Sequence, residues 1–203
     1  MPGKRLLIAT HNRGKIIEMH SLLAALPVKL VTLKDLHLHE VAEEDGLTYA
    51  DNAQKKAFAY ASASGLIAIA DDSGLEVDLL GGEPGIHSAR YSSQPNATDA
   101  DRRAFLLEKL KPFPPPWRAR FRCVLAICHP HGDTRLFEGV CEGVIISHER
   151  GKNGFGYDPI FLLPDLNLTM AELSLEQKNR LSHRARAVQA AFPYLTRLLS
   201  QEA

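Results

Sequence analysis

The order of predicted elements in the first 33 residues constrains the fold more than any other feature of the chain. Residues 5–10 and 28–33 predict two strands. Between them, residues 11–15 predict a polar turn that contains a glycine, and apolar residues at helical spacing over 16–26 predict a helix that ends at Pro27. Strand–helix–strand units of this kind build α/β folds, so we expect an α/β fold.

The turn at residues 11–15 has the composition of an anion-binding loop. The carboxyl end of a strand that leads into a helix N-terminus presents backbone N–H groups and a favourable dipole to anions. Asn12, Gly14 and Lys15 suit a phosphate, with Lys15 as the point charge. The spacing differs from the P-loop pattern, which excludes a P-loop kinase. On spacing alone, a solvated turn with an incidental lysine explains these residues equally well.

Two adjacent carboxylates follow an apolar run in the middle of the chain. Residues 65–70 predict a short buried strand that ends at Asp71 and Asp72. Ionised groups at such a position require a hydrogen-bond donor or a cation. Arg90, further along, has the bidentate geometry that suits an anion. The segment therefore predicts a site where a metal meets phosphate.

The rest of the chain predicts a mixed sheet with further helices. Strands at 119–128 and 136–146 read as an antiparallel hairpin, so the sheet is not all parallel. The other expected elements are a capped helix at 48–64, a short half-exposed strand or extended turn at 75–80, a helix at 98–110 and a last helix after Ser182. In the helix at 48–64, the spacing of Asn52 and Lys56 favours a pair on the helix surface.

The segment GKNGFGYD, residues 151–158, has two interpretations. Three glycines leave such a loop without a local reason for order, so an aromatic between them could be a platform on which a base stacks. A hairpin loop with one aromatic in the core is an equally good interpretation. His183 and Arg184, in the first turn of the last helix, oppose the helix dipole and so favour an anionic or carbonyl-rich ligand.

Charge and cysteine content exclude several classes of protein. The 24 basic residues balance the 24 acidic ones, so no overall field directs the chain to nucleic acid or membrane. The three cysteines are odd in number, lie in apolar surroundings and lack metal-ligand spacing, which indicates buried free thiols in a reducing compartment. The chain has neither a signal-peptide pattern nor an apolar run long enough for a membrane span. We expect one cytoplasmic domain over residues 1–203.

Several motifs, in this order, resemble those of the inosine triphosphate pyrophosphatase family, also called dITP/XTP pyrophosphatases. They are residues 9–15, 43–48 with 52–57, 70–91, 154–161 and 182–184. The resemblance implies hydrolysis of ITP, dITP or XTP to the monophosphate and pyrophosphate, Mg²⁺ as cofactor and a homodimer. It also implies an elongated, two-lobed α/β fold on a long mixed β-sheet with flanking helices, and an active-site cleft between the lobes.

The resemblance further implies roles for individual residues. The metal ligands are Glu44 and Asp72, and Asp72 is also the family's proposed proton acceptor. We count Lys15 and Asp71 as catalytic too, because a second carboxylate beside Asp72 could orient the attacking water or raise the pKa of the base. The substrate-binding residues are Thr10, His11, Asn12, Arg13, Gly14, Lys15, Lys56, Ser73, Phe155, Gly156, Tyr157, Asp158, Lys178, His183 and Arg184. The sequence leaves open which of Asp71 and Asp72 accepts the proton.

Three residues depart from the family pattern. Asp51 replaces a glutamate, and His11 and Arg13 add bulk and charge near the expected phosphate loop. Two alternative functions stay open: a pyrophosphatase for modified pyrimidine triphosphates, and a nucleotide-binding module without turnover.

Overall fold

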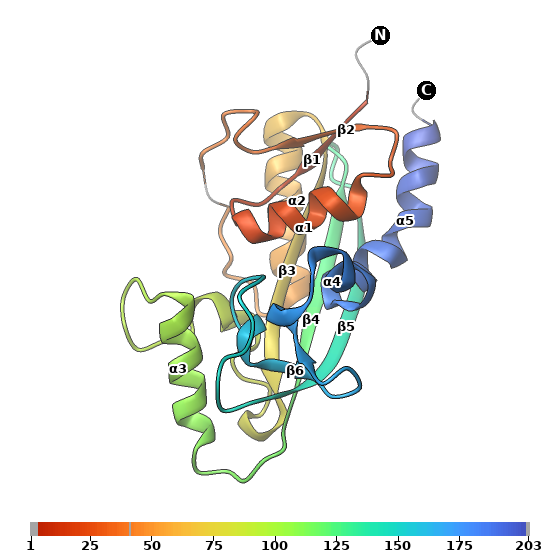
Figure 1. Ribbon diagram of the computed structural model, residues 1–203. Coiled ribbons are helices and arrows are strands. Elements are labelled where there is room, and N and C mark those ends of the chain that lie inside the picture. Colours follow the sequence, from red (N-terminus) through yellow and green to blue (C-terminus); the bar gives the residue numbers. More distant parts are fainter. Residues whose placement is uncertain (1–3, 41, 202–203) are drawn as a thin grey trace. The chain divides into compact units, whose positions relative to one another are not determined.

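The computed structural model describes residues 4–40 and 42–201 and contains a seven-stranded sheet with the strand order β2-β1-β3-β4-β5-β6-β7 (Figure 1). The strands are β1 (Arg5–Ile8), β2 (Lys29–Thr32), β3 (Ile67–Val77), β4 (Trp117–Cys128), β5 (Thr134–Ile145), β6 (Phe161–Leu163) and β7 (Leu168–Thr169). The α-helices are α1 (Arg13–Leu23), α2 (Tyr49–Ser64), α3 (Asp99–Leu110), α4 (Leu175–Leu181) and α5 (His183–Gln201).

The predicted strand–helix–strand unit and the mixed sheet are confirmed. Strand β1 pairs in parallel with both β2 and β3. Strand β6 pairs antiparallel with β5 and β7. Strands β4 and β5 are neighbours joined only by residues 129–133, a connection that is long enough for an antiparallel hairpin but too short for a parallel crossover. The fold is therefore α/β, as the sequence predicts.

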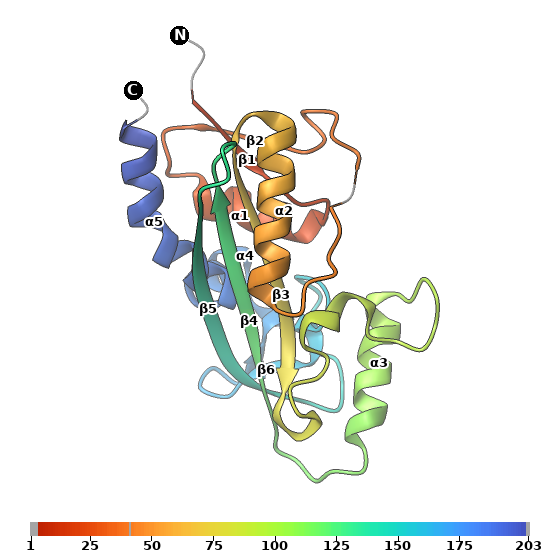
Figure 2. The same cartoon turned by 180° about the vertical axis from the view of Figure 1, so that it is seen from behind.

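The chain divides into two compact units. The first comprises the chain up to Asp72, then Cys123–Gly139, then the chain from Arg184 onward. In this unit α1 and α2 lie on opposite faces of the strands: α1 is in front in Figure 1, and α2 is in front in the reverse view of Figure 2. Its apolar core joins side chains of β1, β3 and β4 to those of α1 and α5, such as Met19 and Val188.

The second unit comprises Ser73–Arg122 and Val140–His183. Its core contains apolar side chains from β3, α3, β4, β5 and β6, among them Leu106 and Phe161. It also includes Tyr157, from the glycine-rich loop. One aromatic of that loop therefore lies in the core, as the second interpretation of the loop expects.

Two expected element boundaries are wrong. Strand β3 does not end at Asp71 and Asp72 but continues through both to Val77. Of the strand or turn expected at 75–80, residues 75–77 therefore belong to β3, and Asp78–Leu80 form a 3₁₀ helix. Helix α1 begins at Arg13, inside the expected turn, because Asn12 caps it by accepting a hydrogen bond from the backbone N–H of Lys15.

Other local predictions are confirmed. Thr48 and Asp51 form a capping box at the start of α2, and Cys123, Cys128 and Cys141 are buried free thiols. Within the part of the chain that the structure describes, no helix combines the length and the apolar character needed to cross a membrane.

Candidate active site

The position of Asp71 and Asp72 inside β3 gives the two carboxylates different surroundings. Neighbouring residues of a strand direct their side chains to opposite faces of the sheet. Both side chains are buried, so each needs its own neutralising partners. The two acids consequently have different partners and different properties.

Asp71 lies in a buried ion network within the first unit. Its Oδ2 is 2.9 Å from Nη2 of Arg184 and 3.1 Å from Nζ of Lys15. The same guanidinium donates through Nη1 to Glu18, and the Arg184 side chain is only 1% exposed. Register explains how Lys15 reaches the acid: β1 pairs with β3 up to Ile69, so the first turn of α1 starts beside the segment that leads into Asp71.

The electrostatics of this network keep Asp71 ionised. Burial alone would raise the pKa of the carboxyl. The charges of Arg184, then Lys15 and Lys56, outweigh burial and hold that pKa far below its ordinary value. Burial alone would lower the pKa of Arg184, but Asp71 and Glu18 outweigh it and raise that pKa. This side of β3 is thus a fixed charge arrangement that does not titrate near neutral pH.

Asp72 has an amide and a lysine as partners. Its Oδ2 accepts a hydrogen bond from Nδ2 of Asn52 at 3.0 Å, and its Oδ1 lies 3.7 Å from Nζ of Lys56. Asn52 and Lys56 are both buried, with Lys56 7% exposed. The expectation that they form a surface pair is therefore wrong, because the face of α2 that they share packs toward the acids.

Burial is the largest influence on Asp72. It raises the pKa of the carboxyl above its ordinary value, and the charges of Lys56 and Lys15 and the hydrogen bond from Asn52 only partly oppose it. The two neighbouring acids thus have pKa values displaced in opposite directions. Such a separation is typical of carboxylate pairs in which one group transfers a proton and the other stays charged.

Three side chains of α2 also fix the acidic loop that precedes the helix. The Tyr60 hydroxyl donates to the carbonyl oxygen of residue 40 and accepts from the N–H of residue 42. Nζ of Lys56 lies 2.8 Å from Oε1 of Glu44. The side-chain oxygen of Asn52 accepts from the backbone N–H of residue 46 at 2.8 Å. These side chains are four residues apart along the helix and so share one face. Glu44 is therefore held on the same side of α2 as Asp72.

The expected phosphate loop is a solvent-accessible helix N-terminus. His11, Asn12 and Arg13 are exposed, while Thr10 and Gly14 are half-buried. The first turn of α1 contains no acidic side chain. Backbone N–H groups, the helix dipole and nearby basic side chains together suit an anion at this end of α1.

The second unit contains a separate group of predicted residues, around Phe155. The buried Asp158 accepts a hydrogen bond from the backbone N–H of Phe155 at 2.9 Å and from Nζ of Lys178. That ammonium lies 5.1 Å from the centre of the Phe155 ring, which is half-buried. Gly154 has a φ of +73°, and a Cβ there would lie 2.0 Å from Oδ2 of Asp158. Only glycine fits this approach.

The remaining predicted residues of this unit differ in exposure. The Tyr157 side chain is in the core, and its hydroxyl donates to the carbonyl of Ser88 at 3.0 Å. His183 is buried, and its ring stacks on Phe121 at 4.8 Å between centroids. Ser73 is half-buried and directly follows Asp72 in β3. Arg90 is exposed and donates to His87, which fits a role within its own 3₁₀ helix (Gly85–Arg90).

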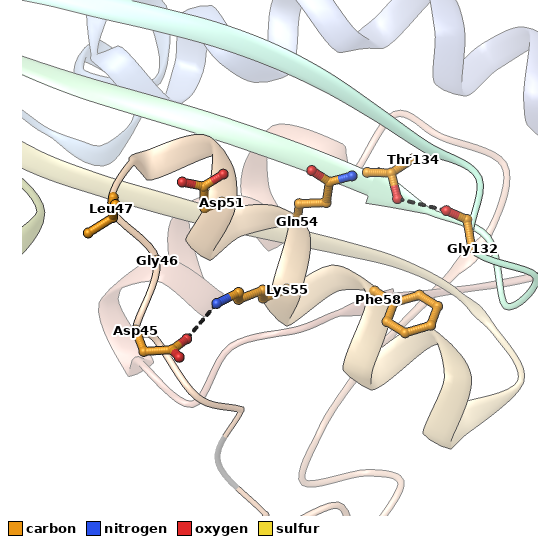
Figure 3. Close-up of a pocket in the computed structure, with 9 residues that line it drawn as sticks. All are labelled: Asp45, Gly46, Leu47, Asp51, Gln54, Lys55, Phe58, Gly132 and Thr134. Carbon is orange, nitrogen blue, oxygen red and sulfur yellow. Dashed lines mark hydrogen bonds and ion pairs between the residues drawn. The ribbon is translucent and has the colours of Figure 1, made fainter.

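A cavity of about 570 Å³ in the first unit lies beside the acidic loop. Figure 3 shows the Asp45–Lys55 ion pair in its wall, with the Phe58 ring at the other end of the same helix face. Its lining residues are Asp45, Gly46, Leu47, Asp51, Gln54, Lys55, Phe58, Gly132 and Thr134. These lining residues do not include Lys56 or Glu44, the predicted site residues of α2 and the loop before it. The cavity therefore lies apart from the group formed by Glu44, Lys56 and Asp72.

The residues that could hold a metal are Glu44 and Asp72. No group of three or more His, Cys, Asp or Glu side chains among residues 4–40 and 42–201 is arranged to bind a metal. Mg²⁺ needs no such group, because it takes one or two carboxylates and completes its shell with water and phosphate oxygens. Lys56 lies near both carboxylates, so their arrangement already accommodates positive charge. The donor set fits Mg²⁺.

Two buried residues near these groups were not predicted from the sequence. Glu18 holds Arg184, and Arg103 binds the glycine-rich loop. Glu18 is a charged residue within the apolar stretch of α1, and this position could have indicated a buried ion pair. Nothing local distinguishes Arg103 from its neighbour Arg102.

The fold and these groups together define an α/β protein whose parallel strand ends suit a phosphate ligand and acid–base chemistry. The model of the Ham1 family matches residues 6–194. A relative from Desulforamulus reducens, named dITP/XTP pyrophosphatase, is 47% identical over 195 residues, which are 96% of this chain and 96% of the relative. One from Geobacter sulfurreducens with the same name is 49% identical over 185 residues, 91% of this chain and 92% of the relative.

A solved structure agrees with these relatives. The HAM1 protein of Coxiella burnetii superposes with a TM-score of 0.84 at 38% identity, covering 98% of this chain and 99% of its own. The chain belongs to the Ham1 family. The family resemblance that the motifs predict is thereby confirmed.

Proposed function

We propose that this protein hydrolyses non-standard purine nucleoside triphosphates, namely ITP, dITP and XTP, to the monophosphate and pyrophosphate, and so removes them from the nucleotide pool. The proposal rests on one observation above all. In a chain whose relatives are named dITP/XTP pyrophosphatases, two adjacent buried carboxylates have pKa values displaced in opposite directions.

We assign the role of general base to Asp72 and a supporting role to Asp71. A base must be free to accept a proton from the attacking water. Asp71 is neutralised by Arg184 and Lys15 and keeps its negative charge, whereas burial makes the carboxylate of Asp72 more basic. Arg184 has its guanidinium in ion pairs with Glu18 and Asp71, so we propose that it positions Asp71 in place of the direct substrate contact expected from the sequence.

Mg²⁺ is the cofactor that we propose, held by Glu44 and Asp72. When bound, it would neutralise phosphate charge at the site of attack. Lys56, which lies 2.8 Å from Glu44, would then be available to the phosphates. Thr10 to Lys15, at the N-terminus of α1, would bind the triphosphate through backbone N–H groups and the Lys15 ammonium.

We propose that the group around Phe155 recognises the base. Phe155 offers a ring face for stacking, and Lys178 and His183 are potential donors to the 6-oxo group of hypoxanthine and xanthine. Adenine has an amine at that position, which would leave a buried donor without an acceptor. Tyr157 would act through its backbone and its core packing, because its hydroxyl is bonded to the Ser88 carbonyl.

We further propose that residues 1–203 act as one pyrophosphatase domain, that the protein is a homodimer and that it works in the cytoplasm. The three free thiols support the cytoplasm, where thiols stay reduced. The support for the homodimer is the family resemblance of the motifs.

A panel of nucleoside triphosphates with product identification tests the function. In the presence of Mg²⁺, ITP, dITP and XTP should release pyrophosphate far faster than ATP does. Release of orthophosphate would exclude the proposed reaction. Preference for a modified pyrimidine triphosphate, or tight binding without any product, would favour one of the two alternatives.

A further inference from the structure

Two side chains of α3 hold one residue of the glycine-rich loop by both of its backbone polar groups. Oδ2 of Asp99 accepts a hydrogen bond from the N–H of Gly156 at 2.8 Å. Nη1 of Arg103 donates to the carbonyl oxygen of the same residue, also at 2.8 Å. The contacts link the start of α3 to the middle of a loop more than 50 residues later in the chain.

Arg103 is itself fixed. Its Nε and Nη2 donate to the two carboxylate oxygens of Glu149 at 2.8 and 2.9 Å, and the residue is only 9% exposed. A bidentate pair of this kind determines the orientation of the guanidinium plane. Nη1 is therefore directed at the Gly156 carbonyl by an arrangement that is rigid before any ligand binds.

The loop depends on such contacts from outside itself. Gly154 and Gly156 have φ values of +73° and +62°, in a conformation that other residues rarely adopt. Glycine has more backbone freedom to lose on ordering than any other residue. Within the loop, Asp158 fixes the N–H of Phe155. Asp99 and Arg103 fix the two peptide groups that follow Phe155, so the backbone is held on both sides of this aromatic residue.

We infer that Asp99 and Arg103 are positioning residues for base recognition, which hold the loop in the conformation that presents the ring of Phe155 to a purine. This inference rests on the proposed function and adds a specificity element to it. A loop ordered in advance spares the substrate the cost of ordering it. Without either side chain, the substrate and the transition state both bind more weakly, which raises KM and leaves kcat nearly unchanged.

Conservative and disruptive substitutions separate this role from simple loss of stability. Asp99→Asn keeps an oxygen that can accept from Gly156, whereas Asp99→Ala does not. Arg103→Ala removes the donor, and Arg103→Lys retains one donor without the bidentate pair. Lys109→Ala is the matched control, because Lys109 lies on the same helix but pairs with Glu83, at 3.1 Å, and not with the loop.

The experiment measures kcat and KM for ITP in these variants. Loss of one charge-assisted hydrogen bond predicts that Arg103→Ala and Asp99→Ala raise KM about tenfold, with kcat within about twofold of wild type. Asp99→Asn and Lys109→Ala should keep a KM within about twofold of wild type, with Arg103→Lys in between. An unchanged KM in both alanine variants would overturn the inference. So would a fall in kcat alone, because that result indicates loss of folded enzyme.

Hydrogen–deuterium exchange of the Gly156 amide provides a readout without turnover. In the protein without substrate, this amide should exchange faster in Asp99→Ala and Arg103→Ala than in wild type, and at the wild-type rate in Lys109→Ala. Equal exchange rates in the wild type and all three variants would overturn the inference. Wild-type enzyme that releases no pyrophosphate would instead refute the proposed function, and the exchange rates would still decide whether α3 orders the loop.

Discussion

Replacing Arg184 with methionine tests the fixed charge arrangement on the Asp71 side of β3. Arg184→Met keeps much of the aliphatic volume and removes the guanidinium that both Asp71 and Glu18 contact. Removing one partner of a buried ion pair leaves an uncompensated charge and costs about 3–5 kcal/mol. For a protein of this size, about 2–4 °C per kcal/mol predicts a fall in Tm of roughly 6–20 °C.

The loss should depend on pH in a defined direction. In the wild type, the pKa of Asp71 is depressed, so its contribution to stability is present above the unfolded pKa, about 3.9, and is lost as the pH falls through the folded pKa. Between pH 7 and pH 5 this contribution is constant. In the variant, we expect burial to outweigh the charges of Lys15 and Lys56 that remain, so that the pKa of Asp71 rises above its unfolded value and the folded state recovers stability as the pH falls. The destabilisation should therefore be smaller at pH 5 than at pH 7.

Thermal and urea denaturation followed by circular dichroism at both pH values measure this effect. Arg180→Met is the matched control, because Arg180 forms an exposed ion pair with Glu176 that should be worth at most about 1 kcal/mol. A loss in Arg184→Met no larger than in this control would refute the account of the network. Equal destabilisation at pH 5 and pH 7 would refute the part assigned to Asp71.

Two further predictions compare neighbouring residues. Without Mg²⁺, Lys56→Met should lower Tm by several degrees, since it removes the ammonium that faces both Glu44 and Asp72, and Mg²⁺ should restore part of the loss in a thermal melt. Lys55→Met removes only an exposed pair and should change Tm by less than about 3 °C; equal effects of the two variants would contradict the roles given to them. In urea denaturation, Gly154→Ala should lower the free energy of unfolding by more than about 2 kcal/mol, because the new Cβ collides with Asp158. In Gly156→Ala the new Cβ meets no atom within 4 Å, so only backbone strain should lower the free energy of unfolding, by about 1–2 kcal/mol. Equal losses for the two glycines would contradict the close approach at Gly154.

Local patterns predicted the elements of the fold, because their signals lie within a few residues. The apolar periodicity of residues 5–33 and the capping pair Thr48–Asp51 are of this kind, and the structure contains both. The strand–helix–strand order was enough to predict an α/β fold, in which β1 pairs in parallel with β2 and β3.

The interior of the site could not be predicted in the same way. Strand β3 continues through Asp71 because the neutralising groups come from far along the chain: Lys15 is 56 residues away and Arg184 is 113. Before those partners are known, two adjacent acids read as the end of a buried strand. Likewise, the spacing of Asn52 and Lys56 shows that they share a helix face but not whether that face packs against the sheet.

The contrast between Asp71 and Asp72 is the central claim of this account, and turnover of ITP by Asp72→Asn tests it most directly. Asparagine keeps the shape of the side chain but cannot accept the proton. Because Asp72 is proposed both as the general base and as a ligand of Mg²⁺, its replacement predicts a fall in kcat of at least about 10²–10⁴-fold at saturating Mg²⁺, in a variant that melts close to the wild-type temperature. Turnover near the wild-type rate by folded Asp72→Asn would contradict the claim.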